Sequence, residues 1–168
     1  MKQLSDVLKE THSPKVIMAI GAVASGKTSI LKPFCTDCGY VRLSPSEIRS
    51  QMKIDEREKK SSQLVWGELH RRVDEALTQG KSVVIDAKNT EGWRRPREVQ
   101  FYKDHGARQV IAAYFDVPLE ELKERNTERP ENERDSEEEL FLSFDQLRHD
   151  PPTLDEGFDE VITVQEAV

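Results

Sequence analysis

The chain has 168 residues, of which 34% are charged, and its formal net charge is -7. This length accommodates one domain with a substantial core and is short for two. No apolar run approaches the roughly 20 residues that cross a bilayer, and residues 1–15 lack the apolar centre of a signal peptide. We therefore expect one soluble, cytoplasmic domain over residues 1–168, with residues 1–14 as an N-terminal extension and a negative surface that repels nucleic acid at long range.

Beyond the extension, short apolar runs alternate with longer amphipathic stretches. This alternation is typical of a parallel β-sheet covered by helices. It predicts an α/β protein whose sheet of about five strands has helices on both faces. The predicted strands are residues 16–20, 40–43, 82–86, 109–115 and 161–164.

A glycine-rich loop, GAVASGKT, occupies residues 21–28, between the first predicted strand and a helix predicted over residues 27–34. Such a loop turns successive backbone N–H groups toward a phosphate, and the positive end of the following helix faces the same anion. The lysine can bridge the β- and γ-phosphates, and the threonine hydroxyl can bind Mg²⁺. We predict a site for ATP, or another nucleoside triphosphate, with Mg²⁺. The expected contact residues are Gly21, Ala22, Ala24, Ser25, Gly26, Lys27, Thr28 and Ser29.

The two cysteines of the chain, Cys35 and Cys38, form a lone CxxC just after the predicted P-loop helix. No second pair and no nearby histidine completes a metal site. Packing under a turn is therefore favoured, with metal or redox chemistry as the alternative.

The second predicted strand is followed by SPSEIR, residues 44–49, with a helix expected to start at Ser46. Glu47 would lie near the helix start and Arg49 further along its first turn. The planar guanidinium of Arg49 can hold a phosphate, although an arginine here would more often be a surface residue. Residues 53–60 are nearly all charged and are expected to be mobile or to form a solvated helix face.

Apolar residues at three- and four-residue spacing predict a helix over residues 62–79, which Gly80 ends. The next predicted strand ends at Asp86 and continues as Ala-Lys-Asn. Asp86 and Asn89 are therefore expected at the carboxyl edge of the sheet, where α/β proteins bind their ligands. An acid there can orient Mg²⁺-bound water or an acceptor hydroxyl, and a simple turn-forming DxxN is the alternative.

Helices are also predicted over residues 93–105 and 119–129, and the second contains ERNTER. Its Arg125 and Arg129 are four residues apart, a spacing that places them on one helix face. Residues 131–139 then carry six acids and one arginine. We expect residues 125–139 to form a lid that clamps the γ-phosphate, with solvated surface charge as the alternative.

Ser136, with Glu139 three residues later, predicts a capping box at the start of one more helix. The apolar face of this helix is formed by Leu140, Phe141, Phe144 and Leu147. No internal repeat is found in the chain.

Four segments resemble the polynucleotide 5′-kinase family, the P-loop end-healing kinases of phage, bacteria and eukaryotes: GAVASGKT, QGKSVVIDAKN, FDVPLEEL with KERNTER, and DPPTLDEGFDEVITV. The resemblance covers about residues 15–164. It implies a P-loop kinase-type fold with an arginine-bearing lid, and ATP-dependent phosphorylation of the 5′-hydroxyl end of RNA or DNA. It also implies that Lys27 and Thr28 serve ATP and Mg²⁺, that Arg125 and Arg129 are lid arginines, and that Arg49 contacts the acceptor or the transferring phosphoryl group.

Two departures from the family both lie on the acceptor side. The family usually carries DxxR after its second strand, with the Asp as general base, but this chain has Ser46 three residues before Arg49. A serine cannot take that proton at neutral pH, so Glu47 is the expected substitute. Lys88 stands where the family typically has a hydroxyl residue, and its charge can grip an acceptor phosphate. The expected acceptor-side residues are Ser46, Arg49, Asp86, Lys88 and Asn89.

An aromatic residue beside a basic cluster can stack a base and hold its phosphates. Candidate contacts of this kind to a nucleic-acid strand are Trp93, Arg94, Arg95 and Arg97, with packing of the tryptophan into the core as the alternative. The acidic surface and the missing Asp favour a second hypothesis, a related kinase for a small-molecule or tRNA-linked hydroxyl. A third is a nucleotide-binding module without transfer activity, which the retained lid arginines disfavour. The resemblance further implies a ligase or phosphatase partner acting in trans.

Overall fold

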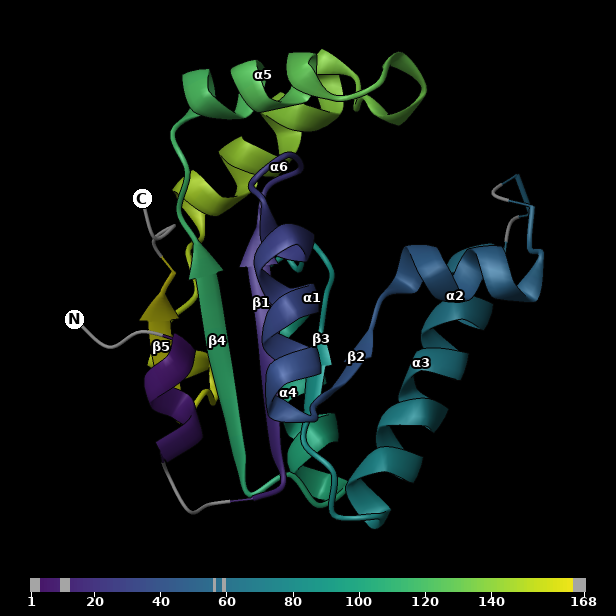
Figure 1. Cartoon of the computed structure of the whole chain (residues 1–168), viewed down its shortest axis with the longest axis vertical. Helices are drawn as coiled ribbons and strands as arrows, with labels where there is room; N and C mark the ends of the chain where they lie inside the picture. Colours follow the sequence, from purple (N-terminus) through teal and green to yellow (C-terminus); the bar gives the residue numbers. More distant parts are fainter. Residues whose placement is uncertain (1–3, 10–12, 56, 59, 165–168) are drawn as a thin grey trace.

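The computed structural model describes residues 4–9, 13–55, 57–58 and 60–164. Its centre is a five-stranded parallel sheet with strand order β2-β3-β1-β4-β5 (Figure 1). The predicted α/β class is confirmed, and each predicted strand is present with bounds shifted by one residue at most. The strands are β1 (Lys15–Gly21), β2 (Val41–Leu43), β3 (Val83–Ile85), β4 (Gln109–Phe115) and β5 (Glu160–Thr163).

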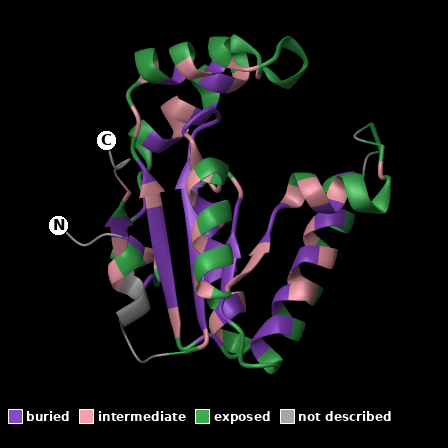
Figure 2. Ribbon diagram, in the orientation of Figure 1, coloured by how far each residue is buried: buried purple, intermediate pink, exposed green. Residues whose placement is uncertain are grey.

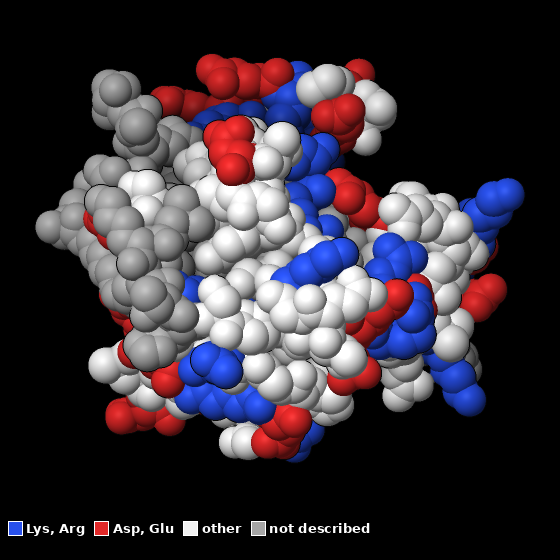
Figure 3. Space-filling view, turned by 60° about the horizontal axis from the view of Figure 1, so that its bottom comes forward, with Lys and Arg blue, Asp and Glu red and all other residues white. Residues whose placement is uncertain are grey.

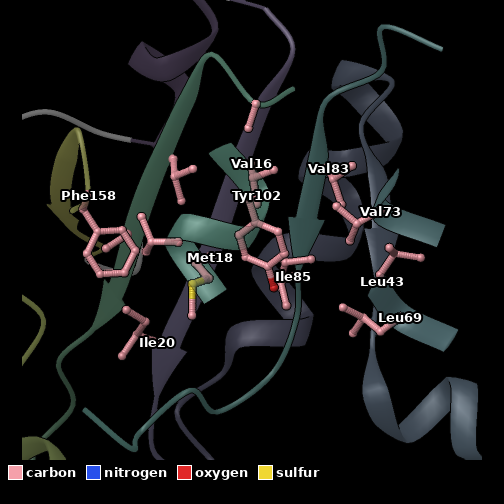
Figure 4. Close-up of a cluster of buried hydrophobic side chains, with 14 of the residues drawn as sticks. Val16, Met18, Ile20, Leu43, Leu69, Val73, Val83, Ile85, Tyr102 and Phe158 are labelled. Atoms are coloured by element: carbon pink, nitrogen blue, oxygen red, sulfur yellow. The ribbon is translucent and has the colours of Figure 1, made fainter. Parts of the chain in front are cut away.

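Helices cover both faces of this sheet, because alternate residues of a strand point to opposite faces. On one face, Val16, Met18 and Ile20 of β1 pack with Tyr102 (Figure 4). On the other, Ile17 and Ala19 pack with Leu31 of the first helix. The sheet is therefore buried on both sides (Figure 2).

The helices in chain order are α1 (Lys27–Cys38), α2 (Pro45–Met52), α3 (Ser61–Thr78), α4 (Arg95–Asp104), α5 (Leu119–Glu128) and α6 (Glu137–His149). Three short 3₁₀ helices are η1 (Leu4–Lys9), η2 (Glu131–Glu133) and η3 (Leu154–Glu156). In the part of the chain that the structure describes, no helix is long and apolar enough to cross a membrane.

The first helix, α1, is longer than its predicted span of residues 27–34. Pro33 lies inside α1, which continues to Cys38 and ends where Gly39 adopts a left-handed φ of 71°. Cys35 and Cys38 are thus in the last turn of the helix and not under a turn beyond it. Both are free thiols, and burial raises the pKa of Cys35 to about 11. Cys35 is buried in the cluster around Ile17 and Leu31, whereas Cys38 is only partly buried, so packing describes the first cysteine.

Three other helix starts differ from expectation by one or two residues, and one of these is α3, which begins at Ser61 and not at residue 62. The helix α2 begins at Pro45 and not at Ser46, because proline suits the first helical position. The helix α4 begins at Arg95, which leaves Trp93 in the preceding turn.

Of the two segments expected to be mobile, the one at residues 131–139 is held to neighbouring residues by hydrogen bonds. Asn126 bonds Asp135 twice, through Asn126 Nδ2 to the Asp135 carbonyl at 2.8 Å and from the Asp135 N–H to Asn126 Oδ1 at 3.0 Å. These bonds tie residues 131–136 back onto α5, and the Ser136 side chain caps α6 by accepting from the Glu139 N–H at 3.1 Å. Only this half of the predicted capping box is formed among the described residues, and the Glu139 carboxylate pairs instead with Lys88. Of the charged segment 53–60, residues 56 and 59 lie outside the described part of the chain.

All five strands run in one direction, so their carboxyl ends meet at one edge of the sheet. The loop 21–26 leaves β1 there, α2 follows β2, the loop 86–94 follows β3, and α5 follows β4. Figure 1 shows α5 above this edge and α2 beside it. The glycine-rich loop, the start of α2 and the loop after β3 therefore meet at this edge of the sheet.

Candidate active site

The loop between β1 and α1 has the backbone shape that a phosphate-binding loop requires. Ala24 and Gly26 take left-handed φ values of 62° and 82°. Gly21 is held tightly, since a Cβ there would lie 2.8 Å from Ser25 Oγ and 2.9 Å from Phe115 Cβ. A side chain at this position would push the loop away from β4. The glycines of the motif thus have a steric function in this chain.

Lys27, the first residue of α1, folds back over the loop. Its Nζ donates to the carbonyl oxygens of Gly21 at 2.9 Å and Ala22 at 2.7 Å, and to Ser25 Oγ at 3.0 Å. Burial lowers the pKa of Lys27 from 10.5 to about 8, against the opposing attraction of Asp86. The lysine is therefore presented at the loop with its charge only partly compensated, as a ligand for an anion.

Thr28 and Asp86 meet at the foot of the loop. Thr28 Oγ1 donates to Asp86 Oδ2 at 3.0 Å, and Asp86 is 5% exposed. The same oxygen accepts from Arg42 Nε at 2.8 Å, while Oδ1 has no hydrogen bond with any described residue. Asp86 was expected on the acceptor side, but this contact places it beside the P-loop, since the carboxyl end of β3 adjoins β1.

Thr28 and Asp86 carry the kind of oxygen ligands that Mg²⁺ prefers, since this ion commonly takes one or two carboxylates together with phosphate oxygens. The Thr28 hydroxyl and the Asp86 carboxylate supply oxygens of both kinds within hydrogen-bond distance of each other. The described residues show no cluster of three carboxylates or histidines, so the protein would contribute only part of a coordination shell. The donor set fits Mg²⁺ bound together with a nucleotide.

The lid arginines are arranged differently from the expected single helix face. Arg125 lies on α5, and its Nη1 donates to the Ser25 carbonyl in the P-loop at 3.1 Å. Arg129 is the residue after α5, with extended backbone angles of -69° and 153°, so the four-residue helical spacing does not apply. Its Nη1 pairs with Asp135 at 2.8 Å. Both arginines nevertheless approach the nucleotide side, one on the loop and one on the cavity.

A cavity of about 550 Å³ lies between the P-loop, the start of α2, the loop after β3 and the lid. Figure 3 shows Lys and Arg side chains in the hollow beneath the lid and acidic side chains over the lid itself. The cavity contains the predicted residues Lys27, Thr28, Ser46, Arg49, Asp86, Lys88, Asn89 and Arg129. Residues from four separate parts of the chain therefore converge on one site.

Glu47, the expected general base, is not among the residues that line this cavity. Its carboxylate accepts from Arg42 Nη1 at 2.9 Å and lies 3.8 Å from Lys32 Nζ. Because Ser46 and Glu47 are adjacent on α2, their side chains point in different directions. Ser46 faces the cavity, where its Oγ lies 3.0 Å from Ser44 Oγ.

Arg49 faces the cavity one turn after Ser46. Its Nε is buried and has no hydrogen-bond partner among the described residues. An unpaired donor in such a place costs free energy that a bound acceptor can restore. Arg49 thus differs from Lys88, which pairs with Glu139, and from Arg129, which pairs with Asp135.

The loop after β3 is held firmly against the P-loop. Asn89, with a left-handed φ of 50°, donates from Nδ2 to the Ala19 carbonyl at 2.7 Å. The Gly21 N–H donates to the Lys88 carbonyl at 3.0 Å. Asn89 therefore shapes this loop, besides lining the cavity.

The basic cluster at residues 93–97 divides into three kinds of residue. Arg95 is fully buried, and its guanidinium donates from Nε and Nη2 to Glu156 at 2.7 Å each and from Nη2 to the Asp150 carbonyl at 2.8 Å. The hypothesis that Arg95 contacts a nucleic-acid strand is therefore wrong. Arg94 stacks 3.8 Å above the Trp66 ring at the cavity.

Trp93 and Arg97 lie outside the cavity. Trp93 is 65% exposed, so the alternative that it packs into the core is also wrong. The guanidinium of Arg97 lies 5.7 Å from the centre of the Trp93 ring.

Several site residues were not predicted from the sequence. Trp66, Glu91, Asp135, Glu139 and Gln146 line the cavity, and Arg42 holds Asp86. Arg42 offers one sequence signal, a charge in the middle of the otherwise apolar strand Val-Arg-Leu. Glu139 and Gln146 bond Lys88 and Thr90, which lie 51 and 56 positions away, and no spacing rule relates residues so far apart.

Comparison with known proteins agrees with this geometry. The AAA_33 family model, described as an AAA domain, matches residues 16–149. The structure resembles a chain in the Pnkp1/Rnl/Hen1 RNA repair complex, with a TM-score of 0.73 and 24% identity over 89% of this chain and 48% of that one. The chain thus spans about half the length of that relative.

Two small-molecule kinases share the fold at lower identity. A sugar kinase from Janibacter has a TM-score of 0.61 and 18% identity, covering 91% of this chain and 87% of that one. A gluconokinase from Sinorhizobium meliloti has a TM-score of 0.62 and 14% identity, covering 93% of this chain and 86% of that one. The fold is thus shared by kinases named for different substrates. The chain belongs to the AAA_33 family, described as an AAA domain, whose model matches residues 16–149.

Proposed function

We propose that this protein transfers the γ-phosphoryl group of ATP, with Mg²⁺, to the 5′-hydroxyl end of RNA or DNA. The observation that carries the proposal is the cavity in which the P-loop residues Lys27 and Thr28 face Arg49, whose buried Nε is unpartnered. The Arg49 Nε lacks a hydrogen-bond acceptor, and the end of a nucleic-acid strand supplies phosphate oxygens close to its terminal hydroxyl.

On the donor side, the loop residues Ala22, Ala24 and Gly26 would present backbone N–H groups to the phosphates, with Ser29 in the first turn of α1 behind them. The N–H groups of Gly21 and Ser25 are bonded to the carbonyls of Lys88 and Ala22, so these two residues shape the loop. Lys27 exchanges the loop carbonyls for phosphate oxygens. Mg²⁺, when bound through Thr28 and Asp86, neutralises charge on the phosphates.

The lid provides the remaining positive charge. Arg125 already contacts the P-loop, and Arg129 lines the cavity in a pair with Asp135. When Arg129 leaves Asp135 for the γ-phosphate, its donors stabilise charge in the transition state. Ser46, Arg49, Lys88 and Asn89 form the acceptor wall, while Asp86 moves to the donor side of the proposal.

A repair partner fits the proposal as well. The similar structure is that of an RNA repair complex, and this chain spans 48% of the matching chain there. We propose that a ligase or phosphatase acts with this kinase in trans.

A second candidate is a kinase for a small hydroxylated molecule, in the class of the sugar kinases that share the fold. The net charge of -7 and the serine at position 46 favour it, since neither helps to bind or activate a nucleic-acid end. Arg49 and Lys88 oppose it, because a neutral sugar offers no phosphate to pair with them.

The test is transfer of labelled γ-phosphate from ATP to 5′-hydroxyl RNA and DNA oligonucleotides, with and without Mg²⁺. A 5′-phosphorylated strand is the matched negative substrate, and gluconate is the small-molecule arm. Metal-dependent label on the 5′-hydroxyl strands alone supports the polynucleotide kinase. Label on gluconate without label on either strand contradicts it and favours the second candidate.

A further inference from the structure

The proposed reaction needs a group that takes the proton of the acceptor hydroxyl. The position after β2 where this base is expected holds Ser46, and a serine cannot take the proton at neutral pH. Its Oγ shares a hydrogen bond with Ser44 Oγ at 3.0 Å. Glu47 is directed away to Arg42 and Lys32. A replacement must therefore be another carboxylate that lines the cavity.

Four carboxylates line the cavity within the described chain: Asp86, Glu91, Asp135 and Glu139. Asp86 accepts from Thr28 and Arg42. Asp135 and Glu139 each pair with a cation of the same cavity, Asp135 with Arg129 and Glu139 with Lys88. A carboxylate whose lone pairs are occupied by a cation is a weaker proton acceptor.

Glu91 is different from these three. It lines the cavity and is exposed, and its carboxylate forms neither a hydrogen bond nor an ion pair with any residue that the structure describes. Its oxygens are therefore free to accept a hydrogen bond from a bound hydroxyl.

Hydrogen bonds of the neighbouring residue Thr90 hold the backbone around Glu91, whereas the Glu91 carboxylate has no hydrogen bond with a described residue. Thr90 Oγ1 donates to Gln146 Oε1 at 2.6 Å, and the Thr90 carbonyl accepts from Arg95 Nη1 at 3.1 Å. On the other side, a Cβ on Gly92 would lie 1.6 Å from Asp150 Oδ2, so the Asp150 side chain packs closely over the backbone there. The loop thus holds the Glu91 Cα in place, while its carboxylate has no partner among the described residues.

The buried pair of Arg95 and Glu156 is what anchors this loop. Arg95 binds Glu156 through two nitrogens at 2.7 Å and reaches the Asn89 carbonyl at 3.4 Å. This contact connects the segment around Glu156, near the end of the chain, to the acceptor wall. A rigid support of this kind is what a positioned base requires.

We propose that Glu91 is the general base for the acceptor hydroxyl, an inference that rests on the proposed kinase function. The acceptor oxygen forms its bond to the γ-phosphorus while the bond from that phosphorus to the β-bridging oxygen breaks. The hydroxyl proton moves to the Glu91 carboxylate, and ADP leaves with the electron pair of the broken bond. The proton then passes to solvent, for which the exposed position of Glu91 is suited.

The test compares Glu91→Gln with Glu91→Asp, Glu47→Gln and the remote exposed variant Glu75→Gln. Multiple-turnover kcat is measured with the acceptor that the wild type labels, and the affinity for a non-hydrolysable ATP analogue is measured in parallel. We expect Glu91→Gln to lower kcat by about 10²-fold or more with unchanged analogue affinity. Glu91→Asp should restore part of the rate, Glu47→Gln should lose less than Glu91→Gln, and Glu75→Gln should match the wild type.

The pH dependence of kcat separates a base from a merely structural residue. The acidic limb of the wild-type profile should disappear in Glu91→Gln. The other charged residues that line the cavity with Glu91 are Lys27, Arg49, Asp86, Lys88, Arg94, Arg95, Arg129, Asp135 and Glu139.

Two results would overturn the inference. One is an active wild type whose Glu91→Gln variant keeps kcat within about threefold and keeps the acidic limb. The other is a loss of analogue binding in Glu91→Gln equal to the loss of rate. A wild type that labels no hydroxyl acceptor would instead refute the proposed function itself, and the inference with it.

Discussion

The donor and acceptor sides of the cavity are built in opposite ways. The donor side is local: Gly21, Lys27 and Thr28 lie within eight consecutive residues, and the lysine bonds the carbonyls of its own loop. The acceptor side is assembled from separate segments, α2, the loop after β3 and the start of α6. Of its two cations, Lys88 pairs with Glu139 of α6, and the Arg49 Nε has no partner among the described residues. Short-range backbone geometry thus determines how phosphate is bound, whereas long-range ion pairs determine what is bound beside it.

This difference has a consequence for specificity. A change in the P-loop alters the binding of every nucleotide, but a change in one acceptor-side pair alters only the acceptor. The departures from the polynucleotide kinase pattern, Ser46 and Lys88, both line the cavity on the acceptor wall. The following predictions test this contrast.

The largest effect is expected from Lys27→Ala on the donor side. Lys27 is a hydrogen-bond donor that would stabilise the charge on the transferred phosphoryl group. Its removal should therefore lower kcat by about 10³-fold with either acceptor class, and the protein should remain folded. Circular dichroism and labelled transfer measure the two properties, with Lys81→Ala as the matched exposed lysine. Unchanged turnover would remove the P-loop from the mechanism.

On the acceptor side, Arg49→Ala should raise the acceptor KM or lower kcat by about 10²-fold while the affinity for ATP stays the same. The reason is that the buried Arg49 Nε has no hydrogen-bond partner among the described residues, those of the P-loop included, and can therefore bind the acceptor. Initial rates against acceptor concentration and nucleotide titration give the two values, and Arg57→Ala, an exposed arginine, serves as control. Equal loss of ATP affinity would erase the contrast between the two sides.

A moderate effect is expected from Glu156→Gln, which keeps the shape of the side chain but removes its charge. Loss of the charged hydrogen bonds to Arg95 should lower the free energy of unfolding by about 1.5–3 kcal/mol. The acceptor KM should rise, because Arg95 holds the loop that carries Lys88 and Glu91. Urea unfolding and acceptor kinetics measure both, with Asp155→Asn as the neighbouring control. A destabilised variant with a normal acceptor KM would show that the pair of Arg95 and Glu156 stabilises the fold without affecting acceptor binding.

The smallest effect concerns pH and distinguishes the donor side again. Because the pKa of Lys27 is lowered to about 8, the unbound lysine loses its proton above that pH, and phosphate binds the protonated form. ATP affinity should therefore be constant below pH 8 and fall by up to tenfold per unit above it. Isothermal titration at several pH values checks the slope, which Lys27→Met should abolish. A wild-type affinity that is flat to pH 9.5 would contradict the assigned protonation.

The sequence by itself determined the α/β class, the five strands and the phosphate-binding loop. Each of these follows from interactions between residues close in the chain: apolar periodicity sets the strands, and two glycines with a lysine shape the loop. Even so, local rules misplaced the end of α1, because Pro33 does not stop a helix whose first turns are already formed and whose Gly39 provides the actual end.

Only the tertiary structure decided which charged side chains share the site. Arg95 and Arg97 look alike in the sequence, yet one is buried against Glu156 and the other lies beside an exposed tryptophan. Asp86 moved from the acceptor side to Thr28, and Glu47 turned away to Arg42, through contacts that join separate strands and helices. The physical reason is that an ion pair depends on distance in space, and residues 61 positions apart, as Arg95 and Glu156 are, leave no local pattern from which that distance can be inferred.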